Sequence, residues 1–151
     1  MTTEIDPRTG LEILDRDECV ALLERSVLAR IAVVIGGHPL VFPVNFTLDG
    51  SAVVLRTGEG TKLHGARGSW VAFECDGADR MYHTGWSVLI TGRAEEIRDP
   101  AGIARLERLP LGPWCPGPKP VWLRIRSREL SGRRIGRHGA TSSDLRERVS
   151  S

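Results

Sequence analysis

Apolar and polar residues alternate with a period of two over much of this chain, a pattern typical of half-buried β-strands. Two such runs, residues 28–35 and 39–48, flank a Gly-Gly turn signal and predict a hairpin. Asp49-Gly50 is a second strong turn signal, and it leads directly into a strand over residues 51–57. The turn chemistry alone therefore predicts a meander of three antiparallel strands.

Short helices interrupt this pattern. Asp15 is followed three residues later by Glu18, a capping-box arrangement that predicts a helix ending near Ser26. Residues 61–67 are compatible with one or two helical turns after a glycine-rich break. An Asp-Pro pair predicts the start of a third short helix over residues 99–108, because proline is favoured in the first turn.

Four further strands are predicted, over residues 69–75, 84–97, 121–126 and 130–135. Residues 76–79 are predicted as a loop, the long strand is expected to bend near Gly92, and the last two strands are expected to form a closing hairpin. Residues 109–120 hold five prolines and two glycines and predict an irregular loop. Six or seven antiparallel strands with two or three short helices imply a closed or nearly closed barrel, since closure hides sheet edges.

Proline gives one more indication about the sheet. Pro43 lies within the second predicted strand and has no N–H to donate to a ladder. We therefore expect that strand to lie at an edge or to contain a bulge.

A chain of 151 residues is expected to fold as one domain, which we assign to residues 11–135. Residues 1–10 and 136–151 are expected to be flexible termini, the second because it has almost no apolar content. Three cysteines cannot all pair within one chain and match no metal-ligand spacing, so we expect no metal and a reducing, cytoplasmic environment. No signal peptide or membrane-spanning run is visible.

Charge argues against nucleic acid as a partner. The net charge is +2, from 21 basic and 19 acidic residues, and gives no general field for a polyanion. Only two of the basic residues are lysines, Lys62 and Lys119, so a lysine just after a predicted strand is unusual in this arginine-rich chain. We therefore single out Lys62 as a candidate binding residue.

The segment around Lys62 has the chemistry of a phosphate cradle. Two cations and two hydroxyls occur within seven residues: Arg56, Thr57, Thr61 and Lys62. A phosphate dianion needs several charge-assisted donors in a small volume, and two intervening glycines allow the backbone to fold back and bring these groups together. The alternative interpretation is a solvated turn with ordinary surface charges.

An ordered set of motifs resembles the pyridoxamine 5'-phosphate oxidase-like superfamily of split β-barrel flavoproteins, in the branch that includes the nitroimidazole-resistance reductases. The similarity covers residues 14–135, and it is the order of the motifs that is specific. They are an opening Leu-Leu helix, Pro43-Val44-Asn45-Phe46, Arg56-Thr57 with Lys62, Gly85-Trp86-Ser87-Val88, Gly92-Arg93-Ala94-Glu95 and Leu130-Ser131-Gly132-Arg133-Arg134-Ile135. The resemblance implies an FMN-binding split barrel that forms a two-fold dimer, with a flavin in each of two interface clefts.

The resemblance also implies roles for particular residues. Thr57 and Lys62 would contact the flavin phosphate, with Arg56 and Thr61 beside them. The isoalloxazine ring would lie against Pro43, Val44 and Asn45, and near Trp86 and Ser87, which stand where the oxidases carry an Arg-Gln pair. An alternative stays open for each of two residues. Trp86 could be a core or dimer-interface aromatic, and Asn45 could serve only to satisfy local backbone groups.

By resemblance, the expected function is that of an FMN-binding oxidoreductase acting on a small aromatic or heteroaromatic molecule, with NAD(P)H as a candidate electron donor. No catalytic residue is assigned, because the cofactor carries the redox chemistry. Oxidation of pyridoxamine phosphate itself is not expected, since no cluster for the substrate phosphate is recognisable. The alternatives are a reductase that depends on coenzyme F-420 and a non-enzymatic protein that binds or sequesters flavin.

Overall fold

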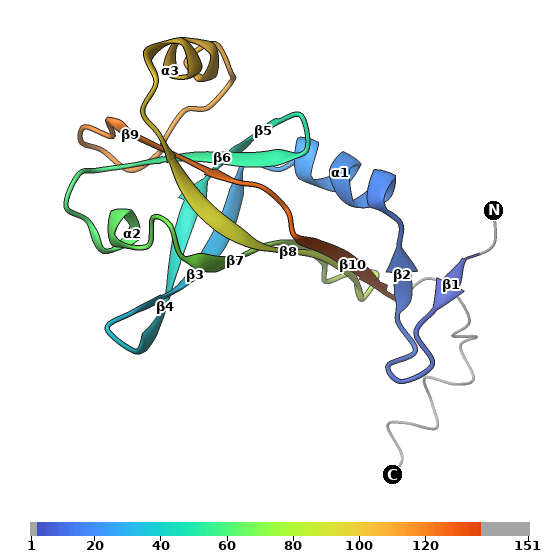
Figure 1. Ribbon diagram of the computed structural model, residues 1–151. Coiled ribbons are helices and arrows are strands. Elements are labelled where there is room, and N and C mark those ends of the chain that lie inside the picture. Colours follow the sequence, from blue (N-terminus) through green and yellow to red (C-terminus); the bar gives the residue numbers. More distant parts are fainter. Residues whose placement is uncertain (1–2, 137–151) are drawn as a thin grey trace.

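The computed structural model describes residues 3–136 and shows a mainly antiparallel β fold with short helices (Figure 1). Its strands are β1 (Glu4–Ile5), β2 (Glu12–Leu14), β3 (Leu28–Ile35), β4 (His38–Asn45), β5 (Thr47–Asp49), β6 (Ala52–Thr57), β7 (Trp70–Asp79), β8 (Thr84–Ile97), β9 (Val121–Ile125) and β10 (Glu129–Ile135). The helices are α1 (Arg16–Glu24), α2 (Lys62–Gly65) and α3 (Pro100–Leu106). This confirms the predicted fold class; the three strands beyond the predicted number are β1, β2 and β5, each of two or three residues.

The long strand β8 belongs to both arms of the sheet. Its first part pairs with β7 and β10 in the order β1-β2-β10-β8-β7-β3-β4, and its last residues, Ala94 to Ile97, pair with β9, which continues to β6 and β5. The change of partner occurs around Gly92, where a Cβ atom would lie 2.2 Å from the carbonyl oxygen of Arg126. Only glycine fits there, so the expected irregularity near Gly92 coincides with the point where β8 changes its partner from β7 to β9.

The predicted pairing of the strands was wrong in one place and interrupted in another. Strands β9 and β10 follow each other in sequence but do not form a hairpin, because β9 pairs with β6 and β8 while β10 pairs with β8 and β2. The three-strand meander is confirmed at both turns, since β3 pairs with β4 and β5 pairs with β6, but its middle strand is broken at Phe46 into β4 and β5, so β4 and β6 do not pair. A turn signal shows where the chain reverses, but the burial of both arms decides which strands become neighbours.

Strand β4 lies at an edge, and no ladder joins it to β6 within the part of the chain that the structure describes. Its residue Pro43 stands opposite Arg30 of β3 and needs no second partner, which confirms the edge position predicted from proline. The barrel is therefore split between β4 and β6.

The local helix predictions are confirmed. At the start of α1 the backbone N–H of Glu18 donates to the Asp15 carboxylate at 2.8 Å, and the Glu18 carboxylate accepts from the Asp15 N–H at 2.9 Å. Thr61 caps α2, and Asp99 caps α3 with Pro100 in its first turn. Side chains close in sequence make these contacts, so the sequence alone identifies them.

Two boundaries differ from the prediction. Residues 76–79 are not a loop, because β7 continues to Asp79 in register with β8, and cross-strand hydrogen bonds outweigh the poor strand propensity of Asp and Gly. Gly77 is required there, since a Cβ atom would lie 2.6 Å from Trp86 Nε1. The N-terminal segment 1–10, expected to be flexible, contains β1 paired with β2. The expected C-terminal tail lies outside the described residues after Gly136.

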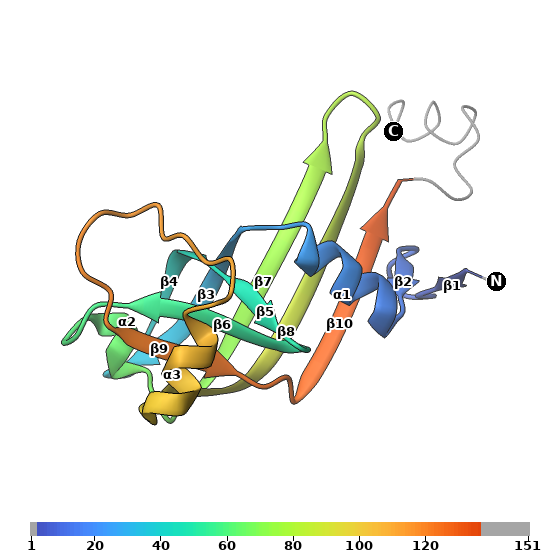
Figure 2. The same cartoon turned by 90° about the horizontal axis from the view of Figure 1, so that it is seen from above.

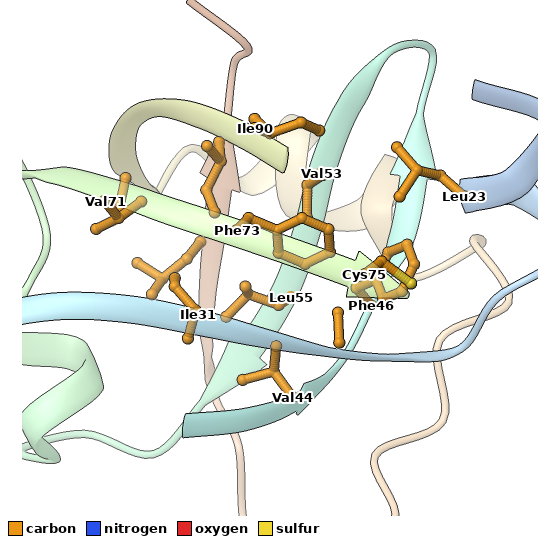
Figure 3. Packing of buried hydrophobic residues seen from close by; sticks show 14 of the residues in the cluster. Leu23, Ile31, Val44, Phe46, Val53, Leu55, Val71, Phe73, Cys75 and Ile90 are labelled. Carbon is orange, nitrogen blue, oxygen red and sulfur yellow. The ribbon is translucent and has the colours of Figure 1, made fainter. Parts of the chain in front are cut away.

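The main core lies inside the barrel and is covered at one end by α1 (Figure 3). Phe73 and Phe46 meet edge to face, with ring centroids 4.9 Å apart, and Phe73 is fully buried. A second, smaller cluster under α3 contains Val54, Leu106 and Trp122. Each such side chain contributes about 1.5–3 kcal/mol through burial. The two clusters hold the strand ends that carry the candidate site.

Candidate functional site

A pocket of about 340 Å³ lies where β4 and β6 face each other without a ladder, a size in the range of small-ligand sites. Its lining includes seven of the residues singled out in the sequence: Pro43, Val44, Asn45, Arg56, Thr57, Thr61 and Lys62. Strand β4 supplies the first three, the end of β6 the next two, and the start of α2 the last two. The split in the barrel brings these separate segments to one place.

The two threonines have different roles in this pocket. Thr61 caps α2: its hydroxyl donates to the Gly58 carbonyl at 2.9 Å and accepts from the His64 N–H at 3.1 Å. The Thr57 hydroxyl lies 2.9 Å from the Thr61 hydroxyl, and Thr57 is only 5% exposed. Since Thr61 is committed to closing the turn, Thr57 is the hydroxyl that can rotate toward a bound anion.

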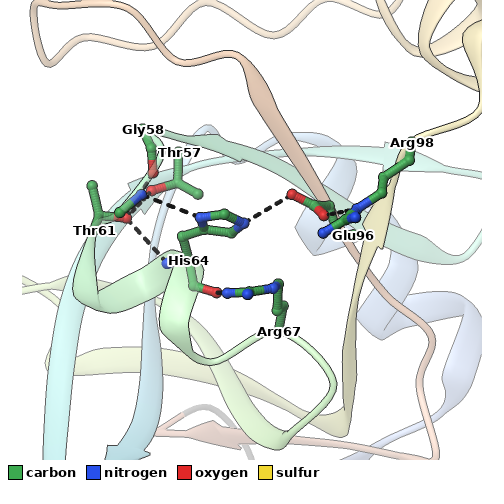
Figure 4. Close-up of polar contacts among 8 residues, drawn as sticks. Thr57, Gly58, Thr61, His64, Arg67, Glu96 and Arg98 are labelled. Carbon is green, nitrogen blue, oxygen red and sulfur yellow. Dashed lines mark hydrogen bonds and ion pairs between the residues drawn. The ribbon is translucent and has the colours of Figure 1, made fainter.

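Behind this turn, His64 links α2 to β8 (Figure 4). Its Nδ1 accepts from the Gly60 N–H at 3.3 Å, and its Nε2 lies 2.8 Å from a carboxylate oxygen of Glu96. With the Gly60 N–H donating to Nδ1, the Nε2–H donates to the Glu96 carboxylate. His64 and Glu96 are 14% and 13% exposed, so this link fixes the turn from the side away from solvent.

Electrostatics keep Glu96 ionised. Burial raises the pKa of this carboxyl, but hydrogen bonds from Arg98 and His64 outweigh burial, and the pKa lies below its ordinary value. Arg67 adds a bond from its guanidinium to the His64 carbonyl at 3.1 Å. This network ties the turn of residues 58–61, here called the cradle turn, to strand β8, which belongs to both arms of the sheet.

Arg56 is held at the pocket by contacts on two sides. Its guanidinium stacks over the ring of Trp122 at 4.7 Å, and its Nε donates to the Lys119 carbonyl at 2.8 Å. Trp122 is 2% exposed and belongs to the cluster under α3. No other hydrogen-bond partner of the Arg56 guanidinium lies among residues 3–136, so its two terminal nitrogens are available to a ligand.

Asn45 connects the pocket to the proline-rich loop. Its amide nitrogen donates to the Val27 carbonyl at 3.1 Å, and its amide oxygen accepts from the Trp114 N–H at 2.8 Å. The side-chain amide is thus used within the protein, and Asn45 lines the pocket while holding the loop. Residues 109–120 arch beside β4 and β6, as Figure 2 shows, and Pro113 contributes to the lining.

The sequence analysis assigned no binding role to five further residues of the lining, which are Phe42, Leu63, Pro113, Cys115 and Lys119. Lysine usage is the signal that identifies Lys119, because both lysines of this chain, 62 and 119, line the same pocket. No pattern in the sequence signals the pairing of His64 with Glu96, which lie 32 residues apart.

Trp86 and Ser87 do not line this pocket. Trp86 borders a different pocket of about 590 Å³ beside the β7–β8 turn, together with Tyr82 and Arg134. Ser87 lies opposite Asp76 on β7 and opposite Arg133 on β10. The described chain therefore brings seven of the predicted residues together and leaves these two elsewhere.

The described residues lack two features that mark other kinds of site. Between residues 3 and 136 there is no group of three or more His, Cys, Asp or Glu side chains that could hold a metal ion. Within the same residues, none of the helices has the length and apolar character that crossing a membrane requires.

Comparisons with known proteins agree on a family. The family model described as pyridoxamine 5'-phosphate oxidase matches residues 15–134 of this chain. The uncharacterized protein Rv0080 of Mycobacterium tuberculosis is 37% identical over 116 residues, covering 72% of this chain and 76% of that protein.

Solved structures show the same fold. An FAD-binding protein from Mycobacterium smegmatis is 35% identical with a TM-score of 0.72, over 83% of this chain and 98% of that one. A conserved protein of unknown function from Corynebacterium diphtheriae, DIP1874, is 33% identical with a TM-score of 0.71, over 87% and 100% of the two chains.

Proposed function

The chain belongs to the pyridoxamine 5'-phosphate oxidase family, and from that premise we propose that it binds a phosphorylated flavin in the pocket between β4 and β6. One observation carries the proposal. The lining of one pocket combines Arg56, Thr57 and Lys62 with the apolar residues of β4. A bound flavin supplies electron or hydride transfer, while the protein binds and orients it.

The residues present fit the chemistry of such a cofactor. Lys62 supplies a point charge, Arg56 a planar fork already positioned by Trp122, and Thr57 a hydroxyl that can donate to a phosphate oxygen. Apolar and proline side chains suited to a flat ring complete the lining: Phe42, Pro43, Val44, Leu63 and Pro113. A lining that combines cationic and hydroxyl donors with apolar side chains suits a molecule that is charged at one end and aromatic at the other.

We propose FMN as the cofactor, with FAD as the second candidate. A terminal phosphate dianion suits a cradle with two cations and a hydroxyl in a small volume. FAD is favoured by a different observation: the similar structure from Mycobacterium smegmatis is that of an FAD-binding protein. Coenzyme F-420 is the third candidate. Its longer phosphodiester tail would need an extended basic groove.

We propose further that two copies form a dimer with one flavin at each interface cleft, so that Ser87 of the partner subunit reaches the ring, while Trp86, which packs against the main core, serves as a core aromatic. Exposed apolar side chains support this assembly, since they lie on the outer face of four neighbouring strands: Leu28, Val34, Val41, Trp70 and Leu89. Ser87 lies two residues before Leu89 on β8, and residues two apart on a strand point to the same face, so Ser87 shares that face. An isologous contact would cover this apolar surface.

The proposed reaction is the reduction or oxidation of a small aromatic or heteroaromatic molecule, with NAD(P)H as electron donor. The apolar wall of the pocket supports this substrate class, because a planar substrate would stack on the flavin ring. Flavin binding without turnover would instead identify a protein that stores or sequesters the cofactor.

The test is to add FMN, FAD, riboflavin and coenzyme F-420 separately to the purified protein and to follow binding by fluorescence quenching. Tight binding of FMN or FAD with weak binding of riboflavin is expected, since riboflavin lacks the phosphate. Equal binding of riboflavin and FMN would refute the phosphate cradle, and no binding of any of them would refute the flavin proposal. Sedimentation with and without cofactor tests the dimer, and a monomer under both conditions would contradict it.

A further inference from the structure

A third pocket, of about 330 Å³, is lined by four arginines that the flavin proposal does not use. Arg16 comes from α1, Arg105 from α3 and Arg124 from β9, and Arg126 directly follows β9. Asp49 and the short turn that follows it complete the lining, with Ser127 at the edge. None of these residues lines the pocket between β4 and β6, so the two sites are separate.

Acidic partners balance only part of this positive charge. Asp49 binds Arg105 with two parallel contacts of 2.7 Å, a bidentate pair. The hydrogen bond from Arg105 lowers the pKa of Asp49; burial opposes this, and the charges of Arg124 and Arg126 add to it. Three guanidinium groups therefore act on one carboxylate.

The second acid near the pocket, Glu95, contributes less. It lies 3.6 Å from Arg124 and 3.9 Å from Arg126, and its side chain is half exposed. Asp99 adds a weaker charge interaction with Arg105, so the four arginines of the pocket face three nearby carboxylates. One positive charge is left without an acidic partner, and a bound anion would balance it.

One nitrogen of Arg124 lacks a hydrogen-bond acceptor. Its Nε is buried, with no hydrogen-bond partner among the described residues. A buried donor on a charged group that lacks an acceptor is costly, and such groups in native proteins need an explanation. An anion that contacts the guanidinium group of Arg124 from the pocket would offset this cost through its charge.

We propose that this arginine pocket binds a small, polar phosphomonoester through its phosphate group. Guanidinium forks match phosphate oxygens in geometry and charge. The volume exceeds what one phosphate fills and lies at the lower end of ligand pockets, leaving room for a small organic group. The lining has no aromatic ring to stack a base, and Ser51 and Ser127 offer hydroxyls, so the organic group is a short sugar or polyol.

The test observes the arginine Nε–H signals of the ¹⁵N-labelled full-length protein with saturating FMN, while orthophosphate or glycerol 3-phosphate is added at constant ionic strength. Saturable shifts of the Arg124 and Arg126 signals are expected, with a dissociation constant near or below about 1 mM. Tighter binding of glycerol 3-phosphate supports the phosphomonoester, whereas equal binding of both probes refutes the organic part. Shifts that sodium chloride reproduces, or no saturable shift, overturn the site.

Variants with opposite expected effects make the test specific. Arg124→Gln and Arg126→Gln should each weaken binding by about tenfold, since each loses a charge-assisted contact. Asp49→Asn should strengthen binding, because it removes the carboxylate that competes for the guanidinium groups. Arg80→Gln is the matched control, which loses the same charge from the exposed β7–β8 turn and should leave binding unchanged.

Arg126 is two-thirds exposed, so its variant should fold even if Arg124→Gln does not. Equal losses in Arg126→Gln and Arg80→Gln would mean that net charge alone attracts phosphate, and the site would be refuted. The outcome is independent of the flavin proposal, because the readout is confined to arginines that do not line the flavin pocket. If FMN does not bind, the same titration without FMN gives the same test.

Discussion

Replacing Glu96 by Gln removes one negative charge from the network behind the cradle turn while keeping the shape of the side chain. In the native structure this carboxylate accepts from His64 Nε2 at 2.8 Å and from Arg98. Glutamine can still accept a bond from His64, but as a neutral group. The variant therefore isolates the contribution of charge to the link between α2 and β8.

The expected magnitude follows from the exposure of each partner. Hydrogen bonds to charged groups contribute about 1.5–3 kcal/mol and neutral ones about 0.5–1.5 kcal/mol, so the bond from His64 should weaken by about 1 kcal/mol. Arg98 is 74% exposed, and its loss adds only a few tenths of a kcal/mol, about the value of a surface ion pair. We expect Glu96→Gln to lower the free energy of unfolding by about 1–2 kcal/mol near neutral pH.

The effect should depend on pH in one direction. The pKa of Glu96 is lower in the folded protein than its ordinary value of 4.5, so its stabilising contribution is complete above that value. The contribution is lost as the pH falls through the lowered, folded-state pKa. The difference between wild type and Glu96→Gln should therefore be largest near neutral pH and shrink in acid.

Urea unfolding from about pH 7 down to about pH 3 measures this difference. Glu95→Gln is the matched control, because Glu95 is the adjacent residue on the opposite face of β8, is half exposed and has only ion pairs of 3.6 and 3.9 Å. It should change the unfolding free energy by less than about 0.5 kcal/mol. Equal effects of the two variants, or an effect of Glu96→Gln that persists unchanged in acid, would refute the reasoning.

Three other predictions concern the cradle, the point where β8 changes its partner and a strand carboxyl. Lys62→Ala should weaken flavin binding by about 1–3 kcal/mol in fluorescence titrations, and Arg80→Ala should not; no loss would remove Lys62 from the site. Gly92→Ala should destabilise the fold by about 1–3 kcal/mol or more in urea unfolding, because its Cβ would lie 2.2 Å from a carbonyl oxygen, whereas Gly112→Ala has open space and should be near neutral. Glu74 has a pKa raised from 4.5 to about 7, by burial first and then by Asp76, so stability should fall as the pH rises between these values. Glu74→Gln should flatten that fall in thermal unfolding curves, and an unchanged slope would assign it to another group.

Much of the local structure could be predicted because its causes are local. The capping box of Asp15 and Glu18, the turn before β6 and the helix start at Asp99 each depend on side chains within a few residues of one another. The same holds for the cradle segment from Arg56 to Lys62, whose residues converge because a short turn joins β6 to α2.

The parts that could not be predicted depend on distant strands. The alternation of apolar residues places β9 and β10 as strands but does not say that the two pair with different parts of β8. The loop predicted at residues 76–79 became strand for the same reason, since its ladder partner follows a four-residue turn that gives no strong sequence signal. Lys119 and Glu96 reach the site from positions far along the chain.

The sequence by itself determined where the longer strands lie, where the helices begin and that cations and hydroxyls gather after β6. The tertiary structure decided that β4 and β6 face each other without pairing, which opens the pocket, and that Trp86 and Ser87 lie outside it. The physical reason is the range of the interactions. Caps and turns are set by hydrogen bonds between near neighbours, whereas the split and the pocket arise only when burial of the whole core fixes which strands remain unpaired.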